Sequence, residues 1–146
     1  MGSELYSKLD ASQETPRPVV EVAAAIIRQQ NRYLIAKRNH DVMFGDLWEF
    51  PGGKRHPGEF LEDCLRREMK EELGIEVAVQ DLFCEVLYPY PHHALILYFY
   101  RCSIQSGEIR PLGCQEFKWV PAHELSEYTF PPANLPLVTE LMALKT

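Results

Sequence analysis

The hydrophobic positions that begin at residue 19 repeat at every second residue, which is the pattern of a half-buried strand. The residues on one face of this segment are Val20, Val22, Ala24 and Ile26. A polar sequence at residues 29–31 is typical of a turn, and it separates the first strand, residues 19–27, from a second at residues 33–36. The two segments therefore predict a hairpin.

The hydrophobic spacing changes after residue 60, where apolar residues recur at every fourth position, as on one face of a helix. These residues are Leu61, Leu65, Met69 and Leu73. Glu59 and Glu62 near the start suit the helix dipole, and Gly74 is placed as a C-cap glycine. A helix is therefore predicted over residues 60–73.

The rest of the chain predicts further strands and a second long helix. The strands are expected at residues 75–79, 82–88, 94–104 and 117–120. A helical turn is expected near residues 121–125 and a helix over residues 135–144, whose first turn tolerates Pro136. A mixed sheet with two main helices indicates the α+β class and an α/β/α sandwich.

The chain has 146 residues, of which 46% are hydrophobic and 25% charged, as in ordinary globular proteins of one domain of about 100–200 residues. We expect a flexible N-terminal arm over residues 1–17 and a single domain over residues 18–146. No apolar run approaches the ~18 residues of a membrane span, and the polar N-terminus does not resemble a secretory signal. These features predict a cytoplasmic protein with no membrane partner.

Acidic residues outnumber basic ones by 21 to 15, for a net charge of −6. Binding to polymeric nucleic acid depends on Lys and Arg, so no such partner is expected, whereas a metal ion could still bridge acidic side chains to a small phosphorylated ligand. Neither the cysteines nor the histidines have zinc-ligand spacing. We expect Cys64, Cys84, Cys102 and Cys114 to be reduced thiols, with a disulfide as the alternative.

Three glutamates lie on one face of the predicted helix, because Glu68 is three residues before Glu71 and four before Glu72. Like charges at this spacing cost roughly 0.2–0.5 kcal/mol per pair, and a hard cation such as Mg²⁺ or Mn²⁺ would offset the repulsion. The alternative is a solvated acidic face with Arg67 and Lys70 as counter-charges. The preceding Pro51–Lys54 sequence predicts a tight, backbone-exposing loop that suits a metal or phosphate, and it favours the metal site.

The segment from residue 53 to 75 is similar to the Nudix box: Gly, five residues, Glu, seven residues, Arg-Glu, an aliphatic, one residue, Glu-Glu, one residue, Gly and an aliphatic. The matching residues are Gly53, Glu59, Arg67, Glu68, Met69, Glu71, Glu72, Gly74 and Ile75. The resemblance implies the Nudix fold and divalent-cation-dependent hydrolysis of a nucleoside diphosphate linked to another group.

The resemblance also implies residue roles. Mg²⁺, with Mn²⁺ as the alternative, would be held by Glu68, Glu71, Glu72 and the carbonyl of Gly52. Arg67 would orient Glu68, and Glu59 would support this network. The general base would be Glu68 or Glu116; the MutT branch has its catalytic Glu directly before a Trp, where this chain has Lys118.

Other segments resemble MutT-type Nudix hydrolases and imply a base pocket. Arg38 ends a strand near that pocket, Gly53 and Lys54 are placed for phosphate, and Phe50 would wall the base. Asn134, in a Phe-Pro-Pro-Ala-Asn segment, would contact oxidised guanine through its amide donor and acceptor. The alternatives are that Asn134 caps the last helix and that Phe50 belongs to the core.

The resemblance leaves three functions open. The first is hydrolysis of 8-oxo-dGTP to the monophosphate and pyrophosphate by a monomer, or alternatively a dimer. The second is the same chemistry on CTP, a modified dCTP or an RNA 5′-triphosphate end, since His92-His93 replaces the Asp-Arg pair of the MutT pattern, unless both are merely exposed loop residues. The third is a non-catalytic module that recognises oxidised bases.

Overall fold

The sheet is built around β1 (Val19–Gln29), which pairs with three other strands. The computed structural model describes residues 18–144, so the arm predicted over residues 1–17 lies outside the described residues. The strand order is β3-β2-β1-β6-β5, with β4 paired to β1 and β7 paired to β2. The other strands are β2 (Arg32–Lys37), β3 (Trp48–Glu49), β4 (Gly52–Lys54), β5 (Glu76–Pro89), β6 (Ala94–Ser106) and β7 (Glu116–Pro121). Only β1 and β6 run parallel, so the sheet is mixed.

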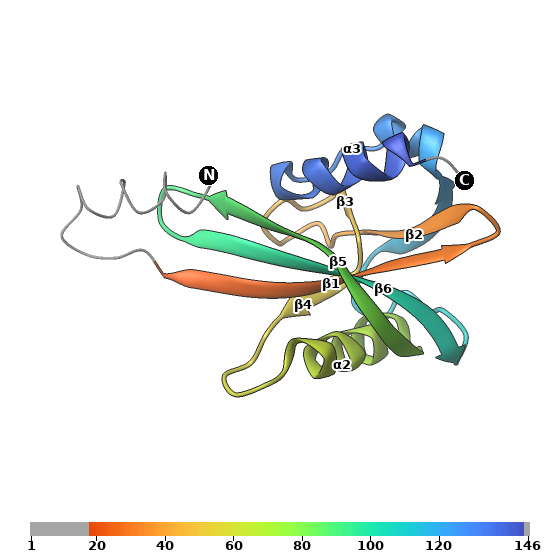
Figure 1. Cartoon of the computed structure of the whole chain (residues 1–146), viewed down its shortest axis with the longest axis horizontal. Coiled ribbons are helices and arrows are strands. Elements are labelled where there is room, and N and C mark those ends of the chain that lie inside the picture. The colour runs from red at the N-terminus through yellow and green to blue at the C-terminus, as the bar shows by residue number, and fades with distance from the viewer. Residues whose placement is uncertain (1–17, 145–146) are drawn as a thin grey trace.

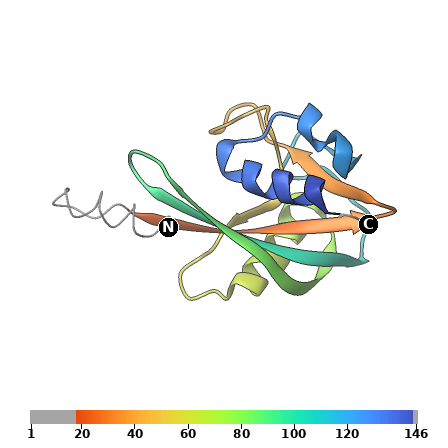
Figure 2. The same cartoon turned by 45° about the horizontal axis from the view of Figure 1, so that its top comes forward.

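The helices cover opposite faces of this sheet (Figures 1 and 2). α2 (Leu61–Leu73) lies on one face, and α3 (Leu135–Ala143) lies on the other with the short 3-10 turns η1 (Ala122–Glu127) and η2 (Pro132–Asn134). The predicted α/β/α sandwich is therefore confirmed. Among residues 18–144 no helix is long and apolar enough to cross a membrane.

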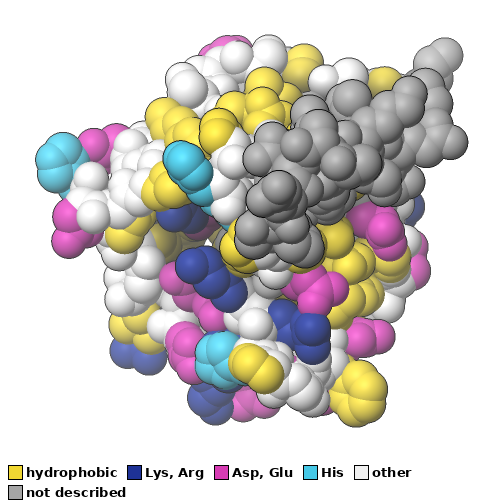
Figure 3. Space-filling model, turned by 90° about the vertical axis from the view of Figure 1, so that its left-hand side faces the viewer, with side chains coloured by type: hydrophobic (Ala, Val, Ile, Leu, Met, Phe, Trp, Pro, Cys, Tyr) yellow, Lys and Arg dark blue, Asp and Glu magenta, His cyan; other side chains and the backbone are white. Residues whose placement is uncertain are grey.

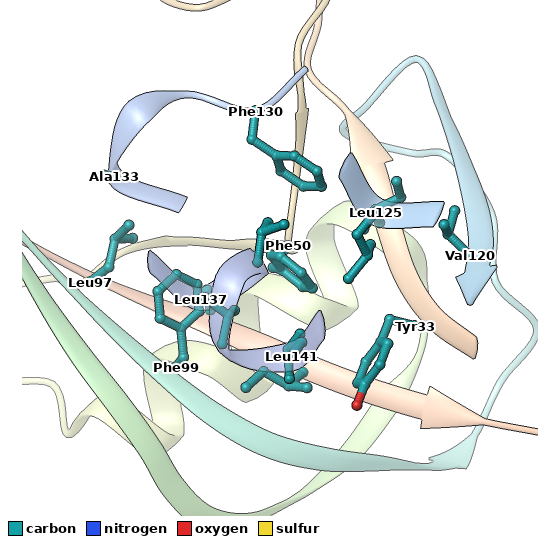
Figure 4. Close-up of a cluster of buried hydrophobic side chains, with 14 residues drawn as sticks. Tyr33, Phe50, Leu97, Phe99, Val120, Leu125, Phe130, Ala133, Leu137 and Leu141 are labelled. Carbon is teal, nitrogen blue, oxygen red and sulfur yellow. The ribbon is translucent and has the colours of Figure 1, made fainter. Parts of the chain in front are cut away.

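β1 faces a hydrophobic core on each side, because successive side chains of a strand point to opposite faces. Ala24 and Ile26 pack with Phe50, Phe99 and α3 in the first core. Figure 4 shows Phe50 and Phe99 of this core beside Leu137 and Leu141 of α3. The alternate residues, Ala23, Ala25 and Ile27, pack against Leu65, Met69 and Leu73 of α2 in the second. The predicted apolar stripe of the helix is thus the face that anchors α2 to the sheet.

The predicted hairpin between β1 and β2 is confirmed. Gln29 pairs with Arg32, and the two intervening residues, Gln30 and Asn31, have φ values of 51° and 63°. Positive φ at both positions is the geometry of a type I′ turn, whose twist matches that of the strands.

Two predicted boundaries were wrong. Gly52–Lys54 is not a loop but strand β4, paired antiparallel with Val22–Ala24. A Cβ on Gly52 would overlap the backbone carbonyl of Ala23, so glycine permits this close pairing. The two strands expected at residues 75–88 form the single strand β5, which keeps its pairing through bulges between Val79 and Cys84.

All four cysteines are free thiols, as expected, and the disulfide alternative is wrong. Cys64 and Cys102 are buried, and burial raises the pKa of Cys102 to about 12. These thiols act as small core residues.

Candidate active site

Residues of α2 bring the predicted acidic cluster to one side of the helix. Burial of Leu65, Met69 and Leu73 fixes the rotation of the helix, and Gly74, at φ 70°, ends it with a bond from its N–H to the carbonyl of Lys70. The neighbouring positions therefore face β4 and the segment that leads into the helix. Figure 3 shows this end of the molecule, where acidic and basic side chains lie next to one another.

The Arg67 guanidinium joins the acidic side chains into a network. Its Nε and Nη2 donate to both carboxylate oxygens of Glu59, at 2.9 and 3.0 Å. Its Nη1 donates to Glu68 at 2.9 Å and reaches Glu71 at 3.3 Å, while Nη2 also binds the Lys54 carbonyl at 3.0 Å. Arg67, with a further bond from the His56 N–H, lowers the pKa of Glu59 to about 2. The Arg67 guanidinium thus keeps Glu59 ionised and fixes the position of Glu68.

Two glutamates of the cluster are partly buried and resist ionisation. Burial raises the pKa of Glu68, against the opposing effect of Arg67. Burial, followed by the repulsion of Glu49 and Glu68, raises the pKa of Glu72 to about 8. The site therefore holds more carboxylate than its own cations balance.

Glu49 belongs to this site although the sequence analysis did not select it. Its side chain is 19% exposed and pairs with Arg38 at 2.7 Å, and burial raises its pKa against the effect of that arginine. β3 places it opposite Ala36, near the end of β2, and Arg38 is the residue that follows β2. The signal for it was an acidic residue inside the apolar segment of residues 47–50.

The donor set fits a divalent cation, but the side chains must rotate to bind one. In residues 18–144 no group of three or more His, Cys, Asp or Glu side chains is arranged to hold a metal ion as it stands. Arg67 occupies Glu68 and Glu71, and the side chain of Glu71 is 59% exposed and free to turn. Carboxylate oxygens are the ligands that Mg²⁺ and Mn²⁺ prefer, and a cation would relieve the repulsion at Glu72.

Gly52 presents a backbone carbonyl that β1 does not use. Residues of an antiparallel pair alternate between exchanging hydrogen bonds and pointing away. The bonds from Ala25 N–H to the Pro51 carbonyl and from Arg55 N–H to the Glu21 carbonyl mark the bonded positions. The bonded residues on the β4 side are thus residues 51, 53 and 55, by alternation. Gly52 occupies a position in between, so its carbonyl points away from β1, as a metal ligand requires.

A cavity of about 410 Å³ lies beside the cluster on the α3 side of β1. The predicted base-pocket and phosphate residues all line it: Arg38, Phe50, Gly53, Lys54 and Asn134. Phe50 is also part of the core, as the alternative held, because it is 2% exposed and stacks on Phe130 at 5.6 Å (Figure 4). Phe50 therefore belongs to the core and also lines the cavity, and its contact with a base stays a prediction.

Asn134 does not cap the last helix. It has helical backbone angles and makes no side-chain capping bond, which excludes that alternative. The residue as a whole is 7% exposed, and within residues 18–144 no hydrogen bond is found to its side-chain amide. The amide atoms are not among the enclosed polar atoms of this region that lack a partner, so they reach the open space of the cavity and are available to a ligand that enters it.

The tip of the β5–β6 hairpin forms one wall of the cavity. A bond from the Tyr90 N–H to the His93 carbonyl closes the turn, and the two rings stack at 5.1 Å. Phe44 contacts Tyr90 from the loop after β2. Thus His92 is exposed, as the alternative held, whereas His93 is half-buried and lines the cavity.

The structure does not bring Glu116 to the glutamates of α2. Glu116 pairs with Lys37 at the start of β7 and shares a strand face with Lys118. The Lys118 ammonium lies over the rings of Trp48 and Tyr128, which pack against the core on the α3 side. The opposite strand face, with Phe117 and Trp119, packs toward α2.

Comparisons with a family model, with individual proteins and with solved structures all indicate the same family. Residues 22–140 match the family model described as the NUDIX domain. The chain is 35% identical to an 8-oxo-dGTP diphosphatase of Haemophilus influenzae, with 86% of this chain and 93% of that protein covered. It is 32% identical to a CTP pyrophosphohydrolase of Escherichia coli, with 87% and 94% covered. The solution structure of the E. coli ORF135 protein superimposes with a TM-score of 0.76 at 32% identity, covering 88% of this chain and 91% of that one.

The two glycines of β4 should respond differently to alanine. A Cβ at Gly53 would overlap the Glu68 carboxylate, whose far end can move, so Gly53→Ala should lower turnover at least roughly tenfold with little loss of stability. At Gly52 the obstacle is the backbone of β1, so Gly52→Ala should cost about 1–3 kcal/mol of stability. Chemical denaturation and steady-state kinetics of both variants measure this contrast, and equal effects on stability would contradict it.

Stability without metal should fall as the pH rises. Glu72 ionises near 4.5 in the unfolded chain and at about 8 in the folded one, so the folded state binds the extra proton between these values. The contribution of Glu72 is complete below about 4.5 and is lost as the pH rises through about 8. Thermal unfolding in EDTA measures this. The decline of the melting temperature with rising pH should be shallower for Glu72→Gln than for the wild type, and it should be unchanged for the exposed control Glu108→Gln.

Proposed function

The chain belongs to the NUDIX domain family, and from this membership we propose that it hydrolyses 8-oxo-dGTP to 8-oxo-dGMP and pyrophosphate. The observation that carries the proposal is the unbonded amide of Asn134, which lines a cavity that opens beside the glutamates of α2. The enzyme would act in the cytoplasm, as a monomer, on the free nucleotide. Its relatives include proteins named 8-oxo-dGTP diphosphatase.

Asn134 supplies the chemistry that distinguishes the oxidised base. 8-Oxoguanine carries an N7–H donor and an O8 acceptor, whereas guanine has an N7 acceptor. An amide offers one donor and one acceptor, and it pairs with the oxidised edge. Guanine would leave a buried polar group unpaired, which is the kind of mismatch that gives large discrimination. Phe50 supplies an apolar wall beside this amide.

Basic and backbone groups continue from the base pocket toward α2. Gly53 and Lys54 line the cavity, and Gly53 lies against the Glu68 carboxylate. No carboxylate within residues 18–144 forms an ion pair with the Lys54 ammonium, so it remains available to a phosphate. A nucleotide whose base lies at Asn134 would therefore extend its phosphates over β4 to the acidic cluster.

Glu68, Glu71, Glu72 and the Gly52 carbonyl would hold Mg²⁺, with Mn²⁺ as the alternative. The bound cation would neutralise the phosphates and make a water molecule more acidic. Arg67 keeps Glu68 at the edge of β4, and a carboxylate there accepts the proton of the attacking water. Glu68 is our candidate for this base. Glu116 remains the second candidate, although its strand face is turned away.

A second candidate substrate is CTP or a modified dCTP. The observation in its favour is the wall of the cavity made by Tyr90 and His93, where the MutT pattern has Asp-Arg in place of His92-His93. A relative of similar identity is a CTP pyrophosphohydrolase. A non-catalytic recognition module is disfavoured, because such a module has no need of the acidic cluster.

A side-by-side steady-state assay with Mg²⁺ tests the proposal. We expect kcat/KM for 8-oxo-dGTP to exceed that for dGTP by about 10⁴-fold and that for CTP by a large factor, with pyrophosphate as product. In heavy-oxygen water the label should enter pyrophosphate, because attack occurs at the β-phosphorus. Glu71→Gln should abolish turnover. Equal or faster turnover of CTP would overturn the substrate assignment, and full activity of Glu71→Gln would overturn the role of the cluster.

Substitution of Asn134 should remove the discrimination. Asn134→Ala should lower kcat/KM for 8-oxo-dGTP by about 10²-fold, because the buried base edge loses its partners, and should change dGTP turnover little. Gln80→Ala, which removes an exposed amide far from this cavity, is the matched control. A parallel loss for both nucleotides would show that Asn134 does not read the oxidised edge.

A further inference from the structure

Arg55, in the segment that joins β4 to α2, is bound to β1 through both its backbone and its side chain. Its N–H donates to the Glu21 carbonyl at 2.9 Å, which extends the pairing of β4 by one position. Its guanidinium Nε and Nη2 both donate to the same oxygen of the Glu21 carboxylate, at 2.8 and 2.5 Å. The two side chains are 32% and 27% exposed, so the pair is shielded from much of the solvent.

The second oxygen of Glu21 is held by β6. The Tyr98 hydroxyl donates to it at 2.9 Å, from the strand that runs parallel to β1. The hydrogen bonds from Arg55 and then Tyr98 lower the pKa of Glu21, which therefore stays ionised. Glu21 thus fixes Arg55 to the two central strands of the sheet.

The other side of the Arg55 guanidinium holds the end of the same segment. Its Nη1 donates to the Glu59 carbonyl at 3.1 Å. Glu59 closes a turn with His56, through bonds between their backbone groups and from the His56 N–H to the Glu59 carboxylate. That carboxylate receives the two-pronged bond of Arg67, which in turn holds Glu68. An unbroken path of polar contacts therefore leads from the sheet to the acidic cluster.

Little else holds this segment in place. Gly58 has φ 79° with open space around its Cα, and Phe60, which precedes α2, is 75% exposed and makes no side-chain cap. A segment with few buried apolar contacts has a low free energy of local opening. Arg67 holds the Glu59 carboxylate, and the backbone position of Glu59 depends on the bond from Arg55.

The path lies on the opposite side of β1 from the cavity. Val20 and Val22 line the cavity, whereas Glu21 points to the α2 side, since neighbouring residues of a strand face opposite ways. A change in this network should affect the carboxylates and spare the base pocket.

We propose that Arg55, anchored by Glu21 and Tyr98, is a positioning residue that sets the Glu59–Arg67–Glu68 network for hydrolysis. The proposal rests on the proposed function of the α2 cluster. Arg55 touches neither the substrate nor the reacting atoms. It acts by restricting the motion of Glu59, and misplacement of a catalytic group by a small distance costs turnover more than substrate binding.

Kinetics of the full-length Arg55→Met variant give the first test. We expect kcat to fall about tenfold with KM and the inhibition constant of the monophosphate product changed less than about twofold, because the base pocket is untouched. Arg55→Lys should recover part of the loss, and Tyr98→Phe should lower kcat by a smaller factor. The control Arg66→Met removes an arginine of an exposed ion pair on α2 and should keep wild-type kcat.

A metal-free measurement tests the same point without turnover. The Arg67 Nε–H signal, assigned in nitrogen-labelled protein by comparison with Arg67→Lys, reports the bond to Glu59. Its hydrogen exchange should accelerate about tenfold in Arg55→Met and stay unchanged in Arg66→Met. If Arg55→Met unfolds, Glu21→Gln and Tyr98→Phe provide the same readout, because each weakens the anchor of Arg55.

The outcomes separate this proposal from the proposed function. Wild-type activity on 8-oxo-dGTP decides the function. The role of Arg55 is decided by two other quantities. One is the ratio of kcat in the variant to kcat in the wild type, on whichever nucleotide is hydrolysed, and the other is the hydrogen exchange of the Arg67 Nε–H. Unchanged kcat with unchanged exchange would overturn the proposal. Equal losses in kcat and in product binding would also overturn it, because they would indicate a general loss of structure.

Discussion

The Arg67 guanidinium is the interaction on which the site depends. Three glutamates within one and a half turns of a helix repel one another, and two of them are partly withdrawn from water. A lysine would supply one point charge, whereas the planar fork of arginine binds Glu59 with two nitrogens and Glu68 with the third. Because Glu59 precedes the helix and Glu68 lies within it, one side chain fixes both the charge balance and the entry of the chain into α2.

The two faces of β1 contact different parts of the site. Its even-numbered residues toward α3 line the cavity or pack beneath it, and its odd-numbered residues toward α2 support the helix that carries the carboxylates. The strand β4, with two glycines, lies at the border of these regions. In the proposed function, the base and the hydrolysed phosphates would therefore lie on opposite sides of one strand, and Glu49 lies near both, at the cavity and beside Glu72.

The sequence alone predicted the features of the fold and the site that depend on local residue patterns. The stripe of α2, the Gly74 cap and the β1 face follow from periodicity, and the glutamate spacing follows from helix geometry. What it missed depends on pairing between distant segments. Gly52–Lys54 has no side-chain pattern that marks a strand, and only its position against β1 makes it one. Glu49 and His93 are recognised as residues of the site only through the partners that the fold brings to them, Arg38 and Tyr90. The absence of a hydrogen bond to the Asn134 amide within residues 18–144 is visible only once its neighbours are placed.

The β5–β6 hairpin has a consequence for the diversity of such enzymes. Its two bulges insert two residues into β5 and so preserve the alternation of faces, with Val77 toward α2 and Val86 toward α3. Its first residue on β6, Ala94, still pairs with β1, and the turn beyond it leaves the sheet. The tip of the hairpin supplies a wall of the cavity, and none of the ring contacts found for Tyr90 and His93 in the described residues involves the acidic cluster of α2. If the proposed function holds, mutations at the tip would alter the base pocket and leave the acidic cluster unchanged, so a lineage could exchange one base for another through a few residues there.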